Sequence, residues 1–170
     1  AMYRSALLLF SVAVGCGTDK AGSTDTSNGH DDALDSGVIG DTDTEAVPEP
    51  PDELSYWLTG SPSDAETDPT GPVALIAGGG ADVDTAMAAW MDHADGGDVV
   101  VLRTSGTGTY NVWLHTTLGG VNSVETLRVD TRALAEDPYV VWRVATAEAV
   151  FMAGGDQSTY LETWTGTALH

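Results

Sequence analysis

From about residue 56 onward, short β-branched runs alternate with stretches of helical periodicity, and this alternation constrains the fold more than any other feature. The run at Asp98–Arg103 is the clearest case, because its continuous apolar centre is typical of a strand buried on both faces. Strands separated by helices are typical of a parallel α/β sheet. The predicted strands are Val73–Ala77, Asp98–Arg103, Ser123–Val129 and Ala149–Met152.

The segments between these strands carry helix signals. The stretch Val83–Ala94 places Met87 and Met91 on one helical face. Asp137 followed by Pro138 is typical of a helix start, with the aspartate as cap and the proline at the first helical position. Further helices are predicted near Tyr110–Leu118 and after Gly154–Gln157, the last one carrying Tyr160, Leu161 and Trp164.

The net charge of −20 is unevenly distributed along the chain. Residues 19–68 hold 14 acidic side chains and one base, Lys20, whereas residues 69–170 hold 12 acidic side chains and four arginines. Nucleic acids and anionic membrane surfaces require a basic footprint on the protein. The composition therefore argues against both as partners, and much of the extreme charge belongs to a segment rather than to a fold.

The first residues resemble an export signal. Arg4 precedes the apolar run Ala6–Val14, which is about half as long as the roughly 20 residues that a membrane-spanning helix needs. Ala13-Val14-Gly15-Cys16 resembles a bacterial lipobox, so we predict a signal peptide over residues 1–16 and lipidation of Cys16. The alternative is a plain signal peptide with an incidental cysteine.

Residues 17–54 are rich in Asp, Thr, Ser, Gly and Pro, and residues 11–55 contain no aromatic side chain. Such a segment cannot bury enough apolar surface to offset its chain entropy, so we predict a disordered acidic linker that leads to a domain at 55–170. A calcium loop beginning at Asp41 is disfavoured, because Ala46 occupies the position of the required glycine.

The single cysteine excludes an internal disulfide and a cysteine-based zinc site. The four histidines show no metal-ligand spacing. We therefore expect no metal and no cofactor.

The turns after the predicted strands point to a ligand site. In an open parallel sheet these turns share the carboxyl edge, where ligands bind. Glycines at such a turn allow close backbone approach, and free N–H groups favour negative charge. The turns expected at this edge are Gly78–Asp82, Thr104–Tyr110, Asp130–Arg132 and Gly154–Gln157.

The residues alone leave more than one role open for these turns. Gly78–Asp82 matches neither a dinucleotide turn nor a Walker loop, which favours a tight turn with Asp82 or Asp84 as a helix cap. Ser105 is either a nucleophile without an identified base or a loop hydroxyl that bonds its own backbone. In Gly154–Gln157, the glycines can offer an oxyanion donor and Gln157 can bind a substrate amide or carboxylate; alternatively, Asp156 caps a helix.

Several motifs in order resemble the N-terminal half of cyanophycinase-like proteins, which are relatives of aspartyl dipeptidases of the peptidase E type. The likeness covers about residues 55–170 and rests on Trp57–Gly60, Ala77–Asp84, Val99–Gly108 with Tyr110-Asn111, Ala149–Gln157 and Trp164–Thr167.

This resemblance implies a flavodoxin-like sheet, as in class I glutamine amidotransferases, with a serine on a nucleophile elbow. It also implies that the Gly-Gly-Asp-Gln turn helps to form the oxyanion hole and the substrate pocket. The implied oxyanion and substrate-binding residues are Gly154, Gly155, Asp156 and Gln157, and the implied pocket rim is Gly79, Gly80 and Ser105.

No Gly-x-Ser-x-Gly occurs in the chain. The resemblance places the serine, histidine and acid beyond His170, so we expect no catalytic residue here and an N-terminal fragment that is inactive alone. A sheet cut after about four strands would leave an interior strand as an exposed edge.

The expected function is that of an exported, lipid-anchored serine hydrolase of the bacterial cell envelope, which acts on peptide or isopeptide bonds. Its partner would be a peptide-like substrate, and it would meet the membrane only through the lipid. The alternatives are a tethered, non-catalytic binding or structural lipoprotein, and a cysteine-dependent amidotransferase. The oligomeric state is open, with a homodimer as one option for the full-length protein.

Overall fold

The computed structural model describes residues 46–78 and 80–170. The predicted signal peptide, Cys16, most of the predicted linker and Gly79 lie outside these residues. Within the described ranges, no helix is both long and apolar enough to cross a membrane.

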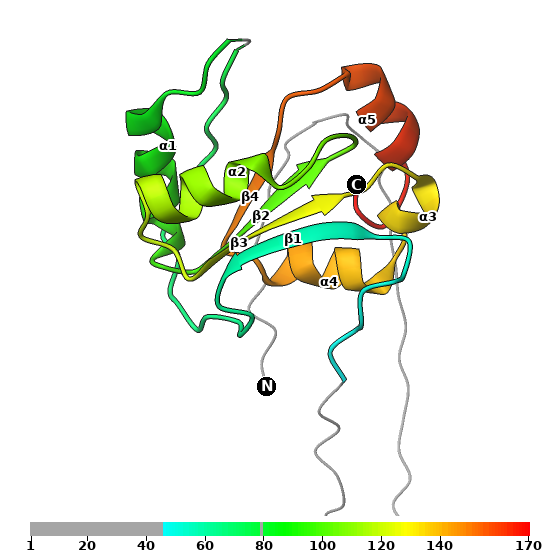
Figure 1. Cartoon of the computed structure of the whole chain (residues 1–170), viewed down its shortest axis with the longest axis horizontal. Helices are drawn as coiled ribbons and strands as arrows, with labels where there is room; N and C mark the ends of the chain where they lie inside the picture. Colours follow the sequence, from blue (N-terminus) through cyan, green and yellow to red (C-terminus); the bar gives the residue numbers. More distant parts are fainter. Residues whose placement is uncertain (1–45, 79) are drawn as a thin grey trace, which may run out of the picture. The chain divides into compact units, whose positions relative to one another are not determined.

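Four strands form one open, mixed sheet in the order β1-β3-β2-β4 (Figure 1). Strands β2, β3 and β4 run parallel to one another, as predicted. Strand β1 pairs antiparallel with β3, so the prediction of a wholly parallel sheet is wrong at this edge. The strands are β1 (Ser55–Gly60), β2 (Asp98–Arg103), β3 (Ser123–Arg128) and β4 (Ala149–Met152).

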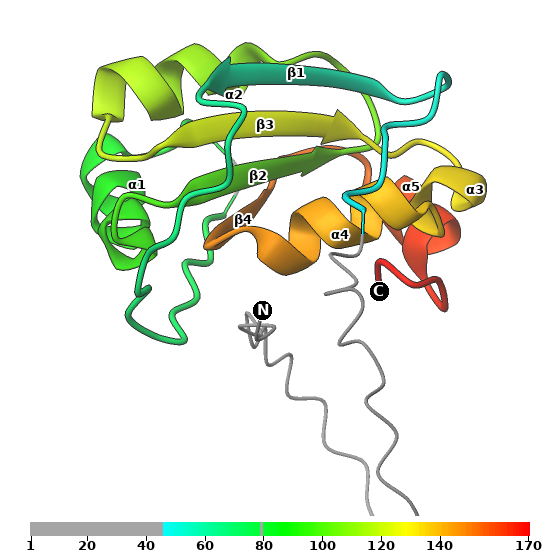
Figure 2. The ribbon, with the colours of Figure 1, turned by 90° about the horizontal axis from the view of Figure 1, so that it is seen from below.

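Helices cover both faces of this sheet, and Figures 1 and 2 show α2 and α4 on opposite sides of it. The arrangement confirms the α/β class. The helical elements are α1 (Asp84–Met91), the 3-10 turn η1 (Asp92–Ala94), α2 (Thr109–Val112), the π-helix η2 (Trp113–Leu118), α3 (Arg132–Ala135), α4 (Pro138–Thr146) and α5 (Gln157–Trp164).

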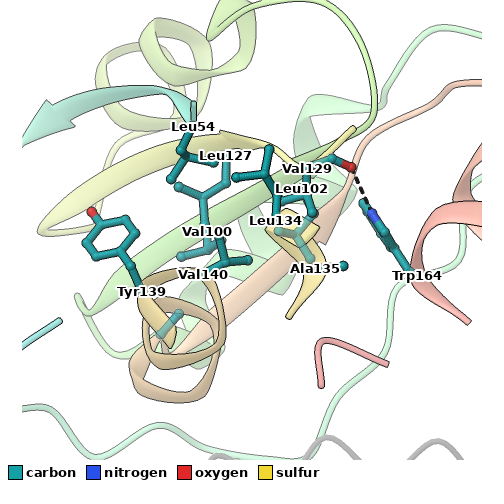
Figure 3. Packing of buried hydrophobic residues seen from close by; sticks show 11 residues of the cluster. Leu54, Val100, Leu102, Leu127, Val129, Leu134, Ala135, Tyr139, Val140 and Trp164 are labelled. Carbon is teal, nitrogen blue, oxygen red and sulfur yellow. Dashed lines mark hydrogen bonds between the residues drawn. The ribbon is translucent and has the colours of Figure 1, made fainter. Parts of the chain in front are cut away.

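The alternating side chains of β2 divide the core into two clusters, because successive residues of a strand point to opposite faces. Val100 and Leu102 pack with side chains of α3, α4 and α5 (Figure 3), whereas Val99 and Val101 pack with those of α1, η1 and η2. All four are at most 4% exposed. The prediction that this strand is buried on both faces is confirmed.

The predicted strand Val73–Ala77 is wrong. These residues form an exposed coil before α1, and the side chain of Ile76 is 91% exposed. None of the amides of this segment donates a hydrogen bond to another described residue. A short apolar run becomes a strand only where a neighbouring strand accepts its hydrogen bonds, and its composition does not reveal whether such a neighbour exists.

The cap at the start of α4 is confirmed and the caps proposed for α1 are wrong. Asp137 Oδ1 accepts hydrogen bonds from the backbone N–H of Tyr139 at 2.9 Å and of Val140 at 3.4 Å. At α1, the N-cap residue is Val83, and no side chain caps the helix. Asp84 lies inside the first turn, where a carboxylate still interacts favourably with the helix dipole.

Candidate functional site

Three of the predicted turns meet at the carboxyl edge of the parallel strands. They follow β2, β3 and β4, and backbone hydrogen bonds join the strand ends at which these turns begin. The N–H of Val129 donates to Arg103 O at 2.8 Å, and the N–H of Ala153 donates to Leu102 O at 3.1 Å. The fourth turn, Gly78–Asp82, follows no strand, so its expected position after one is wrong.

The turn after β4 combines exposed glycines with a helix start. Gly154, Gly155, Asp156 and Gln157 are all exposed. Asp156 is the N-cap of α5: its Oδ1 accepts bonds from the Ser158 backbone N–H at 2.9 Å and from Ser158 Oγ at 2.7 Å. The Ser158 hydroxyl, followed by the Ser158 N–H, lowers the pKa of Asp156. Asp156 is therefore a helix cap. The chemical feature that remains in this turn is its exposed backbone.

Tyr160 of α5 packs against this turn. Its hydroxyl donates to Ala153 O at 2.7 Å, and burial raises the pKa of the phenol, an effect that hydrogen bonds from Thr104 oppose. A Cβ atom at Gly155 would lie 2.9 Å from Tyr160 Cε2, so only glycine fits there without a shift. The sequence pattern places Tyr160 in a helix and does not indicate this contact.

Arg103 organises the turn after β2. Its Nη1 donates to Thr107 O at 2.7 Å and to Thr109 Oγ1 at 3.0 Å, and its guanidinium lies 5.5 Å from the centre of the Tyr110 ring. Gly106 adopts a φ of +90° directly beside this guanidinium. Ser105, a predicted rim residue, is exposed in the same turn.

A second feature lies beside this edge and was not predicted. An open pocket of about 390 Å³ is lined by two carboxylates and two aromatic rings, together with Ala81 and Thr109. The indole N–H of Trp113 donates to Asp84 Oδ1 at 3.2 Å, and the centres of the Trp113 and Tyr110 rings are 6.0 Å apart. Burial, and then the neighbouring Asp82 carboxylate, raise the pKa of Tyr110. Asp82 and Asp84 thus face a pocket, although the sequence favoured a cap.

The opposite, amino edge of the sheet holds a buried polar network. Asp98, only 1% exposed, accepts bonds from Ser123 Oγ at 2.6 Å and Asn122 Nδ2 at 2.8 Å. The Glu148 carboxylate accepts the N–H of Asp98 at 2.6 Å, and burial raises the pKa of Glu148. Among the described residues, no group of three or more Asp, Glu, His or Cys side chains could hold a metal ion.

A buried ion pair lies on the face covered by α4. The Glu125 carboxylate of β3 accepts from Arg143 Nε at 2.6 Å and from the Tyr139 hydroxyl at 2.8 Å. Both charged side chains are almost fully buried. The sequence offers no local signal for this pair, because its members lie 18 positions apart on a strand and a helix.

The predicted site residues are therefore brought together only in part. Gly154, Gly155, Asp156, Gln157 and Ser105 lie in turns at the carboxyl edge, whereas Gly80 lies in the exposed loop before α1. Gly79 is outside the described residues.

Comparison of the chain with protein-family models, with curated proteins and with solved structures gave no match.

Proposed function

We propose that the chain supplies the oxyanion-binding and substrate-binding part of an exported, lipid-anchored serine hydrolase of the cyanophycinase-like type. The observation that carries the proposal is the turn after β4. Its two glycines are exposed, and neither the Gly154 nor the Gly155 N–H donates a hydrogen bond to another described residue. Backbone N–H groups without a protein acceptor, held at the carboxyl end of a strand, are suited to stabilise an oxyanion.

The proposed chemistry is acyl transfer to water at a peptide or isopeptide bond. A serine Oγ attacks the carbonyl carbon and passes its proton to a histidine. The carbonyl oxygen becomes an oxyanion that the glycine N–H groups stabilise, and the C–N bond breaks as the amine takes the proton from the histidine. Water then hydrolyses the acyl-enzyme. The serine, histidine and acid are proposed to lie beyond His170.

The finer assignment of the fold belongs to the same proposal. Parallel strands in the order β3-β2-β4, with helices on both faces, support a flavodoxin-like sheet. We also propose that residues 1–16 direct export, that Cys16 carries the lipid and that residues 17–54 form the tether.

The experiment is to read the coding DNA beyond residue 170 and to assay the complete gene product on peptide and isopeptide substrates. The proposal expects a Gly-x-Ser-x-Gly within roughly the next strand and turn, followed by a histidine and an acid, and hydrolysis that is lost when that serine becomes alanine. An in-frame stop directly after His170, confirmed by the intact mass of the native protein, would overturn it.

The pocket beside α2 favours a second candidate, a tethered binding protein without catalysis. Two carboxylates and two aromatic rings suit a cationic ligand, because the negative charges and the ring faces both attract a cation. The test is titration calorimetry with an alkylguanidinium on the complete protein and on its Asp82→Asn variant. Binding that weakens in the variant, in a protein that hydrolyses no substrate, would favour this candidate.

A further inference from the structure

We propose that Tyr160 is the positioning residue of the oxyanion hole, and that the donor whose direction it sets is the N–H of Gly154. The inference rests on the proposed function and identifies how its site is held in place. It begins from the bond that the Tyr160 hydroxyl donates to Ala153 O at 2.7 Å.

The Ala153 carbonyl and the Gly154 N–H belong to the same peptide group. In a planar trans peptide, the C=O and N–H bonds point in opposite directions. Because Ala153 O points toward Tyr160, the N–H of Gly154 points away from it. This N–H has no hydrogen-bond acceptor among the described residues.

A backbone hydrogen bond of the preceding peptide group also restricts the position of this one. The N–H of Ala153 is bonded to Leu102 O at 3.1 Å, which joins the end of β4 to that of β2. Gly155 then lies against the Tyr160 ring without space for a side chain. The peptide that carries the Gly154 N–H thus has little freedom to rotate.

Tyr160 is itself linked to the ends of β4 and β3. Its hydroxyl donates to Ala153 O, just after β4. Its ring packs edge-on against Trp164 with centres 4.6 Å apart, and Trp164 Nε1 donates to Val129 O, just after β3, at 2.9 Å (Figure 3). A donor that is oriented before the reaction needs no reorganisation as negative charge develops, and this is the origin of oxyanion-hole catalysis.

The test compares Tyr160→Phe with Tyr139→Phe in the complete natural protein. Each variant loses one phenol hydrogen bond; the Tyr139 hydroxyl serves Glu125 on another face, so this variant controls for lost stability. We expect Tyr160→Phe to lower kcat about 10- to 100-fold with KM within about twofold, and Tyr139→Phe to leave kcat nearly unchanged at equal fraction folded. Equal losses of kcat in the two variants, or no loss in either, would overturn the proposal.

A second readout does not depend on activity. With ¹⁵N-glycine labelling, Tyr160→Phe should shift the Gly154 amide resonance, and Tyr139→Phe should not. An unchanged Gly154 resonance in Tyr160→Phe would overturn the positioning role even in an active enzyme. If the wild-type protein hydrolyses no substrate but the resonance responds as expected, the proposed function fails and the positioning of this peptide group stands.

Discussion

At the scale of single residues, the two glycines of the β4 turn differ in what surrounds them. A Cβ at Gly155 would lie 2.9 Å from the Tyr160 ring, whereas a Cβ at Gly154 would meet no heavy atom within 4 Å. Gly155 therefore contributes the absence of a side chain, whereas Gly154 contributes an N–H that donates to no other described residue.

Gly155→Ala should consequently lower the free energy of unfolding by about 1–3 kcal/mol, because the added methyl group must displace Tyr160 or the turn. Gly154→Ala is the matched control and should change it by less than about 0.5 kcal/mol. Urea unfolding measures both. Equal losses in the two variants would show that the ring does not limit this turn.

Glu148 gives a pH dependence at the same scale. Burial raises its pKa in the folded protein, so the folded state holds the proton more tightly than the unfolded state does. The stability from this group is present below its usual pKa of 4.5 and is lost as the pH rises through the higher, folded pKa.

The free energy of unfolding of the wild type relative to Glu148→Gln should therefore fall as the pH rises from 4 upward. Urea unfolding of both proteins across this range measures the difference. A difference that rises with pH would mean that the folded state favours the ionised Glu148 carboxylate.

At the scale of elements, short sequence patterns predicted features that depend on neighbouring residues, such as a buried strand and a helix cap. The apolar centre of β2 and the Asp137-Pro138 pair at the start of α4 each lie within a few consecutive residues, and both predictions are confirmed. The pairing of β1 with β3 joins residues such as Ser55 and Arg128, which are far apart in sequence, and no local pattern encodes it. The contact of Tyr160 with Ala153 spans only seven positions, but it depends on how α5 packs against the β4 turn.

The segment Val73–Ala77 gives an element-scale prediction. Its amides donate no hydrogen bond to a described residue, so Leu75→Pro should change the free energy of unfolding by less than about 1 kcal/mol. Val100→Pro, in the centre of β2, should cost about 3 kcal/mol or more through a lost ladder bond and a steric clash. If Leu75→Pro proves as costly as Val100→Pro in thermal or urea unfolding, the segment is a strand after all.

At the scale of the whole molecule, the acidic charge is concentrated toward the N-terminal part of the chain, whereas three of the four strands lie after residue 68. The net charge of −20 includes a segment at 19–68 with a single base, whereas the later residues carry four arginines, one of them, Arg143, buried against Glu125. Among the described strands, β4 pairs on one side only, with β2, and half of the Met152 side chain is exposed there.

An unpaired strand edge of this kind can pair with another chain. Residues 55–170, expressed alone, should therefore be poorly soluble or oligomeric when analysed by size-exclusion chromatography with light scattering. A monodisperse monomer with a sharp cooperative melt would show that this part of the chain is a complete domain.

The central claim is that the glycine turn after β4 serves a serine nucleophile, and phosphonylation of the complete natural protein tests it most directly. A fluorophosphonate probe transfers its phosphonyl group to an activated serine, and mass spectrometry locates the adduct. We predict a single adduct on the serine of a Gly-x-Ser-x-Gly beyond His170, formed more slowly in Tyr160→Phe than in Tyr139→Phe. A folded, complete protein that takes up no phosphonyl group would contradict the claim.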